Sequence, residues 1–181
     1  SEMCIRDRTT PMPYSYIEGV LRQELEKDGQ TLEGIFQSIE VTPLASASIA
    51  QVHSAILKNG DNVVLKVQKP EVDTIIQTDL GMMVGLTKLI DSIAPSLKFA
   101  SISPIIDEIR LRMAAETDFL QEAKNIDDFQ DFLKKTDNHK VVAPDVYHDI
   151  STKKVLVMTR FFGVSMIDDA AMRQYLSLIH I

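Results

Sequence analysis

A loop of small residues and a single lysine are the parts of this sequence best suited to binding phosphate. The loop lies in PLASASIAQVH at residues 43–53, and the lysine, Lys66, lies in VVLKVQKP at residues 63–70. Small residues let the main chain approach a phosphate closely, so that backbone N–H groups and a nearby ammonium can share its charge. These two segments predict a phosphate site, although an ordinary solvent-exposed lysine on an edge strand explains Lys66 equally well.

Three acidic residues further along the chain are candidate partners for this lysine, because a buried lysine needs one. Glu116, Asp118 and Glu122 occur in AETDFLQEAKN, within an apolar pattern that predicts one helix over residues 104–134. In such a helix Asp118 and Glu122 share a face, whereas Glu116 projects from a different side. Acidic residues on a helix are also common as solvating charges, and that explanation suffices for Glu116 or Asp118 taken singly.

A β-hairpin must position the loop and the lysine. Residues 48–67 are rich in β-branched and apolar side chains, and KNGD at residues 58–61 supplies the Asn-Gly pair of tight turns. In the returning strand Val63, Leu65 and Val67 share one face and leave Lys66 on the other. We therefore expect Lys66 to be half buried.

Helices and further short strands surround this hairpin and give an α+β fold class. Helices are predicted over residues 15–27, 32–39 and 71–93, and strands over residues 140–142, 146–148 and 154–158.

Four segments occur in an order and spacing typical of one protein family. They are ASAS with its SIAQVH continuation at residues 45–53, VLKVQKP around Lys66, ETDFLQEAKN at residues 116–125 and VLVMTRFFG at residues 155–163. Together they resemble the UbiB/ADCK atypical protein-kinase-like family, which is associated with ubiquinone and other prenyl-quinone metabolism. The resemblance covers residues 11–168. It implies a kinase-like N-terminal lobe, with an antiparallel sheet, an αC-type helix and additional family-specific helices.

The resemblance also implies roles in ATP binding and catalysis. Lys66 matches the lysine that contacts the α- and β-phosphates, and Glu122 matches the glutamate that pairs with it. Glu116 and Asp118 match the ExD acids of the family.

A loop of alanine and serine replaces the glycine-rich loop of ordinary kinases. Its residues are Ala45, Ser46, Ala47 and Ser48, where Ser46 stands in place of the usual alanine of the family. An alanine Cβ disfavours positive φ and keeps the backbone farther from phosphate than glycine would. A nucleotide geometry unlike that of ordinary kinases is therefore implied, with ATPase-like rather than efficient protein-phosphorylating activity.

The strand that resembles the one leading into a kinase hinge provides the adenine side of the site. Met158 matches the residue behind the adenine pocket, and Thr159 to Phe161 offer main-chain groups to the adenine edge. A purely structural role for Met158 is compatible with this interpretation, because a pocket wall is also core.

The ends of the sequence fit the pattern less well. KDGQ at residues 27–30 spells the KxGQ motif of the family but lies too close to Ala45, so we expect a helix end with Gly29 as its cap. Residues 1–10 are expected to be a non-native terminus. Residues 169–181 are expected to be the truncated start of a C-terminal lobe with a non-native end. No catalytic loop or metal-binding aspartate follows Gly163, and we expect this chain alone not to hydrolyse ATP.

Composition narrows the function classes further. The net charge of −7 argues against a nucleic-acid surface, and the single cysteine excludes a disulfide within the chain and a cysteine metal cluster. The four histidines show no ligand spacing, so no metal site is predicted, and His53 is expected to be a strand residue rather than a base. No apolar run approaches the ~20 residues of a membrane helix.

Three functional hypotheses remain. The first is the ATP-binding lobe of an atypical kinase or ATPase in quinone metabolism, with Mg²⁺ bound in the longer protein. The resemblance implies ATP or ADP and prenyl-lipid or quinone-pathway proteins as partners. It also implies peripheral association with a bacterial, mitochondrial or plastid membrane. The second is a non-catalytic pseudokinase lobe that acts as a nucleotide-dependent switch for lipid or protein binding. The third is an acidic helical interaction domain without a ligand.

Overall fold

The computed structural model describes residues 9–27, 29–70, 72–93 and 102–163. The segments expected to be terminal additions lie outside these ranges, except for residues 9 and 10. The helices are α1 (Tyr14–Leu25), α2 (Leu32–Ile35), α3 (Val72–Ile93), α4 (Ile102–Glu116), α5 (Phe119–Lys135) and the short 3₁₀ turn His148–Ile150. The strands are β1 (Phe36–Ile39), β2 (Ala45–Ser46), β3 (Ala50–Leu57), β4 (Asn62–Gln68) and β5 (Val155–Thr159).

The described strands form one antiparallel sheet, as expected for the α+β lobe. Their order is β1-β3-β4-β5, and β2 pairs with the start of β3. The β3–β4 hairpin turns at Gly60, whose φ of +93° is one that glycine adopts without strain. In the register of the sheet Lys66 lies between Val52 and Leu156, so the predicted lysine is on a central strand and not on an edge.

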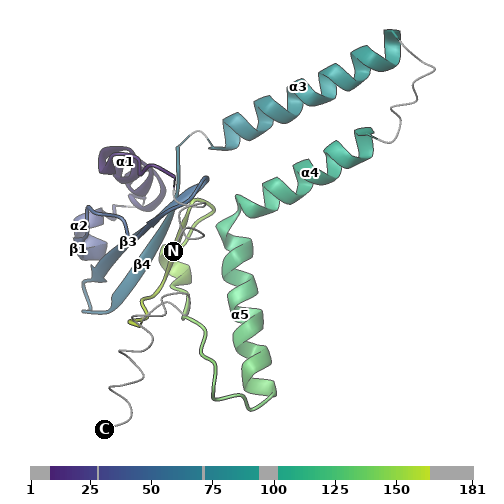
Figure 1. Cartoon of the computed structure of the whole chain (residues 1–181). Coiled ribbons are helices and arrows are strands. Elements are labelled where there is room, and N and C mark those ends of the chain that lie inside the picture. Colours follow the sequence, from purple (N-terminus) through teal and green to yellow (C-terminus); the bar gives the residue numbers. More distant parts are fainter. Residues whose placement is uncertain (1–8, 28, 71, 94–101, 164–181) are drawn as a thin grey trace, which may run out of the picture.

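Each face of the sheet packs against a different helix. On one face Val63, Leu65 and Val67 are fully buried in a core that includes Ile17 and Leu21 of α1. On the other face Ala50 and Leu156 pack against Phe119 and Ala123 of α5. Figure 1 shows α1 and α5 on these two sides of the sheet. The alternation predicted for β4 therefore separates a structural core from the face that carries Lys66.

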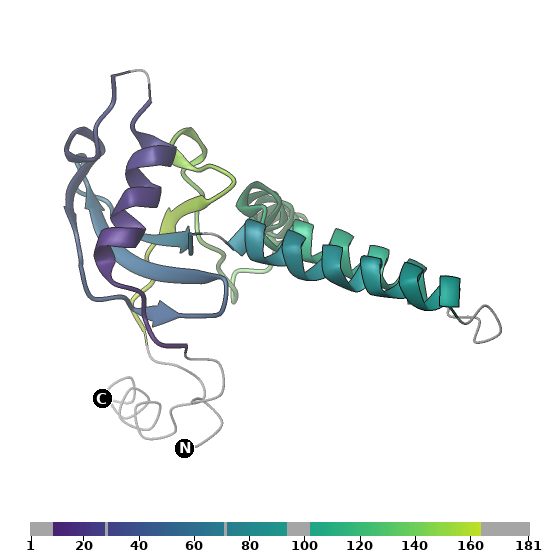
Figure 2. The same ribbon diagram turned by 90° about the horizontal axis from the view of Figure 1, so that it is seen from above.

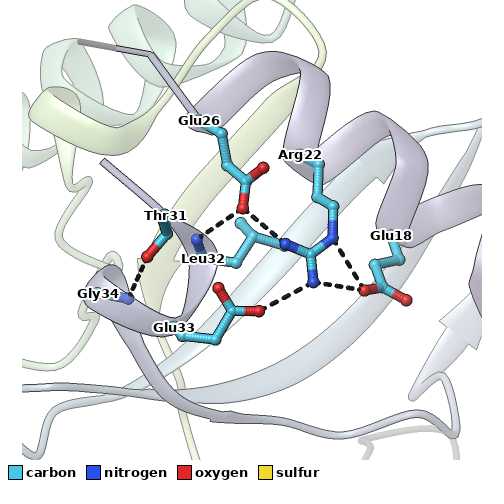
Figure 3. A network of polar contacts seen from close by, with 7 residues as sticks. All are labelled: Glu18, Arg22, Glu26, Thr31, Leu32, Glu33 and Gly34. Carbon is cyan, nitrogen blue, oxygen red and sulfur yellow. Dashed lines mark hydrogen bonds and ion pairs between the residues drawn. The ribbon is translucent and has the colours of Figure 1, made fainter. Parts of the chain in front are cut away.

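An arginine of α1 joins the first two helices (Figure 3). The Arg22 guanidinium contacts Glu18 at 2.8 Å, Glu26 at 2.6 Å and Glu33 of α2 at 2.9 Å. Its hydrogen bonds to Glu33 and Glu18 raise the pKa of Arg22, and the bond from Arg22 lowers the pKa of the Glu33 carboxyl. Glu26 also accepts a hydrogen bond from the Leu32 N–H at 3.1 Å. The contacts of Glu26 and Glu33 therefore hold α1 against α2.

The helix predicted over residues 71–93 is confirmed as α3, which packs on α4 in a hairpin that projects from the sheet (Figures 1 and 2). Several large apolar side chains of this hairpin are exposed: Met82, Met83, Leu86, Leu89, Ile105, Ile109, Leu111 and Met113.

The single helix predicted over residues 104–134 is wrong, because the chain forms two helices that meet at a bend. Asp118 is the N-cap of α5, with extended backbone angles, and its side chain accepts a hydrogen bond from the Leu120 N–H at 3.0 Å. A carboxylate in this position satisfies a free backbone donor at a helix start and so favours a new helix. Asp118 consequently precedes the helix and does not share a helical face with Glu122.

Two other local predictions are wrong. The helix predicted over residues 32–39 ends at Ile35, and Phe36–Ile39 forms β1, which pairs with β3. α1 ends at Leu25 with Glu26 as its C-cap, so Gly29, with φ +85°, lies in the following turn and does not cap the helix. The pairing of Phe36–Ile39 with β3 sets the end of α2.

Of the last three predicted strands, residues 154–158 are confirmed as β5. Residues 140–142 form no strand, and Val142 is 72% exposed. Within residues 146–148 only Val146 pairs, in one isolated bridge with Met158.

Candidate nucleotide site

Lys66 and Glu122 meet on the α5 side of the sheet. The Lys66 Nζ lies 2.5 Å from Glu122 Oε2, and the two side chains are 26% and 36% exposed. β4 contributes the lysine and the first turns of α5 contribute the glutamate, where the positive end of the helix dipole favours an acid. The predicted contact is confirmed, while its part in nucleotide chemistry stays a prediction.

A buried aromatic ring supports the lysine. The Lys66 ammonium lies 4.9 Å from the centroid of Phe119, which is fully buried. A cation over a ring face is attracted by the quadrupole of the ring. The Phe119 N–H also donates to the Lys153 carbonyl at 3.0 Å, which ties the start of α5 to the chain entering β5. Since Phe119 opens the helix that carries Glu122, the same residue fixes both members of the ion pair.

The alanine-rich loop is a tight turn between β2 and β3. Ala45 is exposed in β2, and the Ala47 N–H donates to the Ala50 carbonyl at 2.8 Å. Ala47 and Ser48 are exposed, whereas Ser46 is buried, with its Oγ 3.3 Å from Thr9 Oγ1. The extra hydroxyl of Ser46 therefore faces the segment that precedes α1.

The two other acidic candidates lie apart from the ion pair. Glu116 is the last residue of α4, is exposed, and forms no ion pair with the described residues. Asp118 caps α5 and lies 3.8 Å from Lys153 Nζ. Because neither acid contacts Lys66 or Glu122, a catalytic role for Glu116 and Asp118 stays a prediction.

On the adenine side of the predicted site, two main-chain donors are already used within the lobe. The Thr159 N–H donates to the Asp145 carbonyl at 2.9 Å, and the Arg160 N–H donates to the Asn62 carbonyl at 3.0 Å. The Phe161 N–H donates to none of the described residues, and its side chain is 55% exposed. A ligand at this edge can therefore be met by the Phe161 N–H and by carbonyl groups, but not by the Thr159 N–H.

Met158 lines the same face of the sheet as Lys66. It is partly buried, and it packs against the cluster formed by Ala50, Phe119, Ala123 and Leu156. This placement suits both the wall of a pocket and a core residue.

Two buried polar residues beside the loop were not identified from the sequence. Gln51 is fully buried, and Lys69 is 9% exposed at the end of β4. Burial lowers the pKa of the Lys69 amine. His53, expected as a strand residue, lies in β3 and is fully buried, with its Nδ1 2.9 Å from the Glu40 carbonyl. In the sequence, the only sign of this role for Lys69 was its place three residues after Lys66, in KVQKP.

Two searches of the described residues bear on cofactors and membranes. Over residues 9–163, with their gaps, no group of three or more His, Cys, Asp or Glu side chains is arranged to hold a metal ion. None of the helices in this part of the chain has the length and apolar character needed to cross a bilayer.

Comparison with known proteins gives a consistent result. The sequence profile of the ABC1 atypical kinase-like domain matches residues 4–180. A chloroplastic aarF domain-containing protein kinase of Arabidopsis thaliana is 34% identical over 173 residues, which are 94% of this chain and 32% of that protein. A probable protein kinase UbiB of Aeromonas hydrophila is 33% identical over 170 residues, which are 93% of this chain and 30% of that protein. This chain thus spans about a third of the length of these relatives.

A solved structure shares the fold. It is the complex of Rv3197 with erythromycin from Mycobacterium tuberculosis, with a TM-score of 0.69 and 31% sequence identity. The match covers 87% of this chain and 38% of that chain.

Proposed function

Since this chain belongs to the ABC1 atypical kinase-like family, we propose that it is the ATP-binding lobe of an atypical kinase or ATPase. The observation that carries the proposal is the contact between Lys66 and Glu122, 2.5 Å apart on the α5 side of the sheet. Kinases require this kind of lysine–glutamate pair to position the α- and β-phosphates of ATP. The family membership supports a role for the pair in ATP binding. The contact between the two side chains indicates where in this lobe the phosphates of ATP would bind.

In this proposal Lys66 and the alanine-rich loop share the phosphate charge. An ammonium has three donors, of which one is directed at Glu122, and the Lys66 side chain is still 26% exposed. Ala47 and Ser48 are exposed on the loop, where small side chains leave the main chain accessible. Mg²⁺ would neutralise phosphate charge when it is bound, and we assign no residue of this chain to it.

The adenine ring would meet the end of β5. Met158 supplies apolar surface on the Lys66 side of the sheet, and the Phe161 N–H is the donor that the sheet leaves unused among the described residues at this edge. Thr159 would contribute through its carbonyl or side chain.

The wider role of the protein is proposed from its relatives. Relatives named as probable protein kinases UbiB support a function linked to ubiquinone or other prenyl quinones, with prenyl lipids or proteins of that pathway as partners. Chloroplastic and bacterial relatives support a plastid or bacterial location, with association at a membrane surface.

Calorimetric titration with Mg·ATP tests the proposal. We expect saturable binding by the wild-type chain and by Lys58→Met, a control at an exposed turn residue. We expect Lys66→Met to weaken binding about tenfold or more, which corresponds to about 1.4 kcal/mol. Equal affinity of the Lys66→Met and Lys58→Met proteins would contradict the proposed site.

A pseudokinase lobe that switches a binding surface is the second candidate. It is favoured by the exposed apolar side chains of the α3–α4 hairpin, such as Met82, Leu86 and Leu111. Nucleotide binding without turnover by the full-length protein would support this candidate, and ATP hydrolysis would support the first.

A further inference from the structure

The segment that precedes α1 crosses the alanine-rich loop and binds its carbonyl groups. The Thr9 N–H donates to the Ser46 carbonyl at 3.2 Å, and the Thr9 hydroxyl donates to the Ala47 carbonyl at 2.7 Å. These residues are 37 and 38 positions apart in sequence. The contact therefore joins the loop to a distant part of the chain.

Lys69 joins the same arrangement from the end of β4. Its ammonium donates to Thr9 Oγ1 at 2.8 Å, and its backbone N–H donates to the Ile49 carbonyl at 2.8 Å. The Thr9 hydroxyl gives its hydrogen to Ala47 and can accept from Lys69, so these bonds are mutually compatible. Among the described residues Lys69 forms no ion pair, although buried amines are costly unless they are well paired. Stability alone is therefore a poor explanation for a lysine at this position.

Gln51 holds the other end of the segment. Its Oε1 accepts from the Met12 N–H at 2.6 Å, and its Nε2 lies 3.4 Å from the Met12 carbonyl and 3.2 Å from His53 Nε2. The Glu40 carbonyl can only accept, so His53 Nδ1 carries the hydrogen and His53 Nε2 accepts from Gln51. The amide orientation of Gln51 is thereby fixed, and it matches the two main-chain groups of Met12.

We propose that residues 9–12 form a strap that holds the alanine-rich loop in its phosphate-binding shape, with Gln51 and Lys69 as positioning residues. The carbonyls of Ser46 and Ala47 in the loop, and that of Ile49 just after it, are engaged by donors of the strap and of Lys69. A carbonyl oxygen repels an anion, whereas a backbone N–H attracts one. By holding these carbonyls, the strap and Lys69 leave the Ser48 and Ile49 N–H groups, which donate to none of the described residues, to the ligand. Thr9 lies within residues 1–10, which were expected to be a non-native terminus, whereas the family profile matches residues 4–180 and so includes the strap.

Amide hydrogen exchange followed by NMR tests the strap without any nucleotide. The reporter is the Ala47 N–H, which closes the loop onto the Ala50 carbonyl, and the reference is the Leu65 N–H at the centre of the sheet. Thr9→Val and Lys69→Met should each speed exchange at Ala47 several-fold and leave Leu65 unchanged. Thr9→Ser keeps the hydroxyl and should restore the slow exchange.

Matched controls exclude general loosening of the lobe. Thr10→Val alters a neighbouring exposed threonine, and Lys58→Met alters an exposed lysine, so both should exchange like wild type at Ala47. Unchanged exchange at Ala47 in both Thr9→Val and Lys69→Met would overturn the strap. Equal acceleration at Ala47 and Leu65 would also overturn it, because it would indicate a structural effect on the whole sheet.

The expected effect of the strap on phosphate binding rests on the proposed function. The strap and the nucleotide site can nevertheless fail separately. In titrations with Mg·ATP, Lys69→Met should weaken binding several-fold through the loop, since the proposed site does not include Lys69, whereas Lys58→Met should not. Faster Ala47 exchange with no ATP binding by any variant would support the strap and refute the nucleotide site. Conversely, the strap would be refuted and the nucleotide site supported if ATP binding depended on Lys66 while Thr9→Val and Lys69→Met left exchange at Ala47 unchanged.

Discussion

Replacing Lys66 by methionine and Glu122 by glutamine, singly and together, measures how strongly the two side chains are coupled. Unit charges about 4 Å apart interact by about 1 kcal/mol in water and about 4 kcal/mol near a protein surface. The side chains are 26% and 36% exposed, so solvent screens much of this energy, and fixing two long side chains offsets more. We therefore expect a coupling free energy of about 0.5–1 kcal/mol in the stability of the lobe.

Urea unfolding of the four proteins supplies the four stabilities of the cycle. With a slope of about 2 kcal/mol per molar urea, the expected coupling moves the midpoint by about 0.25–0.5 M. In about 1 M NaCl the screening length falls to ~3 Å, and the coupling should fall clearly. A coupling of zero at low salt would refute the reasoning, because the two groups would then not share an ion pair. A coupling that high salt leaves unchanged would refute its electrostatic origin.

Three further predictions concern the elements that hold this pair. Phe119→Ala should lower the free energy of unfolding by about 3–5 kcal/mol in urea titrations, because the ring is fully buried; a loss below 1 kcal/mol would contradict the packing of α5. Asp118→Ala should cost about 1 kcal/mol by the same measurement, since its cap to the Leu120 N–H is lost; Asp118→Asn, which keeps an acceptor, serves as its control. Arg22 lowers the pKa of Glu33 in the folded state, so the stabilisation is present above the unfolded-state pKa of that carboxyl and is lost as the pH falls through the folded-state value. Urea midpoints should therefore fall less between pH 6 and acid pH in Glu33→Gln than in wild type, and identical pH profiles would contradict this role.

The hairpin, and the places of Lys66 on a strand and of Glu122 on a helix, could be predicted because local patterns specify them. The alternation of Val63, Leu65 and Val67 placed Lys66 on the opposite face of β4, and the helical spacing after residue 119 placed Glu122 on α5. Both patterns act within a few residues of the side chain concerned. The meeting of the two residues needed the family resemblance, which supplied a partner 56 positions away.

The errors arise where hydrogen bonds to distant or capping groups decide the structure. Phe36–Ile39 became a strand because it pairs with β3, which the local sequence does not reveal. Asp118 interrupted an otherwise continuous apolar pattern because its carboxylate caps a new helix. Gln51 and Lys69 were missed since their partners, Met12 and Thr9, are 39 and 60 positions away.

The most direct test of the central claim observes the Lys66 ammonium itself during nucleotide binding. In a chain labelled with ¹⁵N-lysine, Mg·ATP is added while the side-chain nitrogen signals of Lys66 and the exposed Lys58 are followed by NMR. We expect a saturable shift of the Lys66 signal with Lys58 unmoved, and the signal that shifts should be missing from the spectrum of Lys66→Met, which assigns it to Lys66. Saturable binding that leaves the Lys66 nitrogen signal unchanged would contradict the central claim.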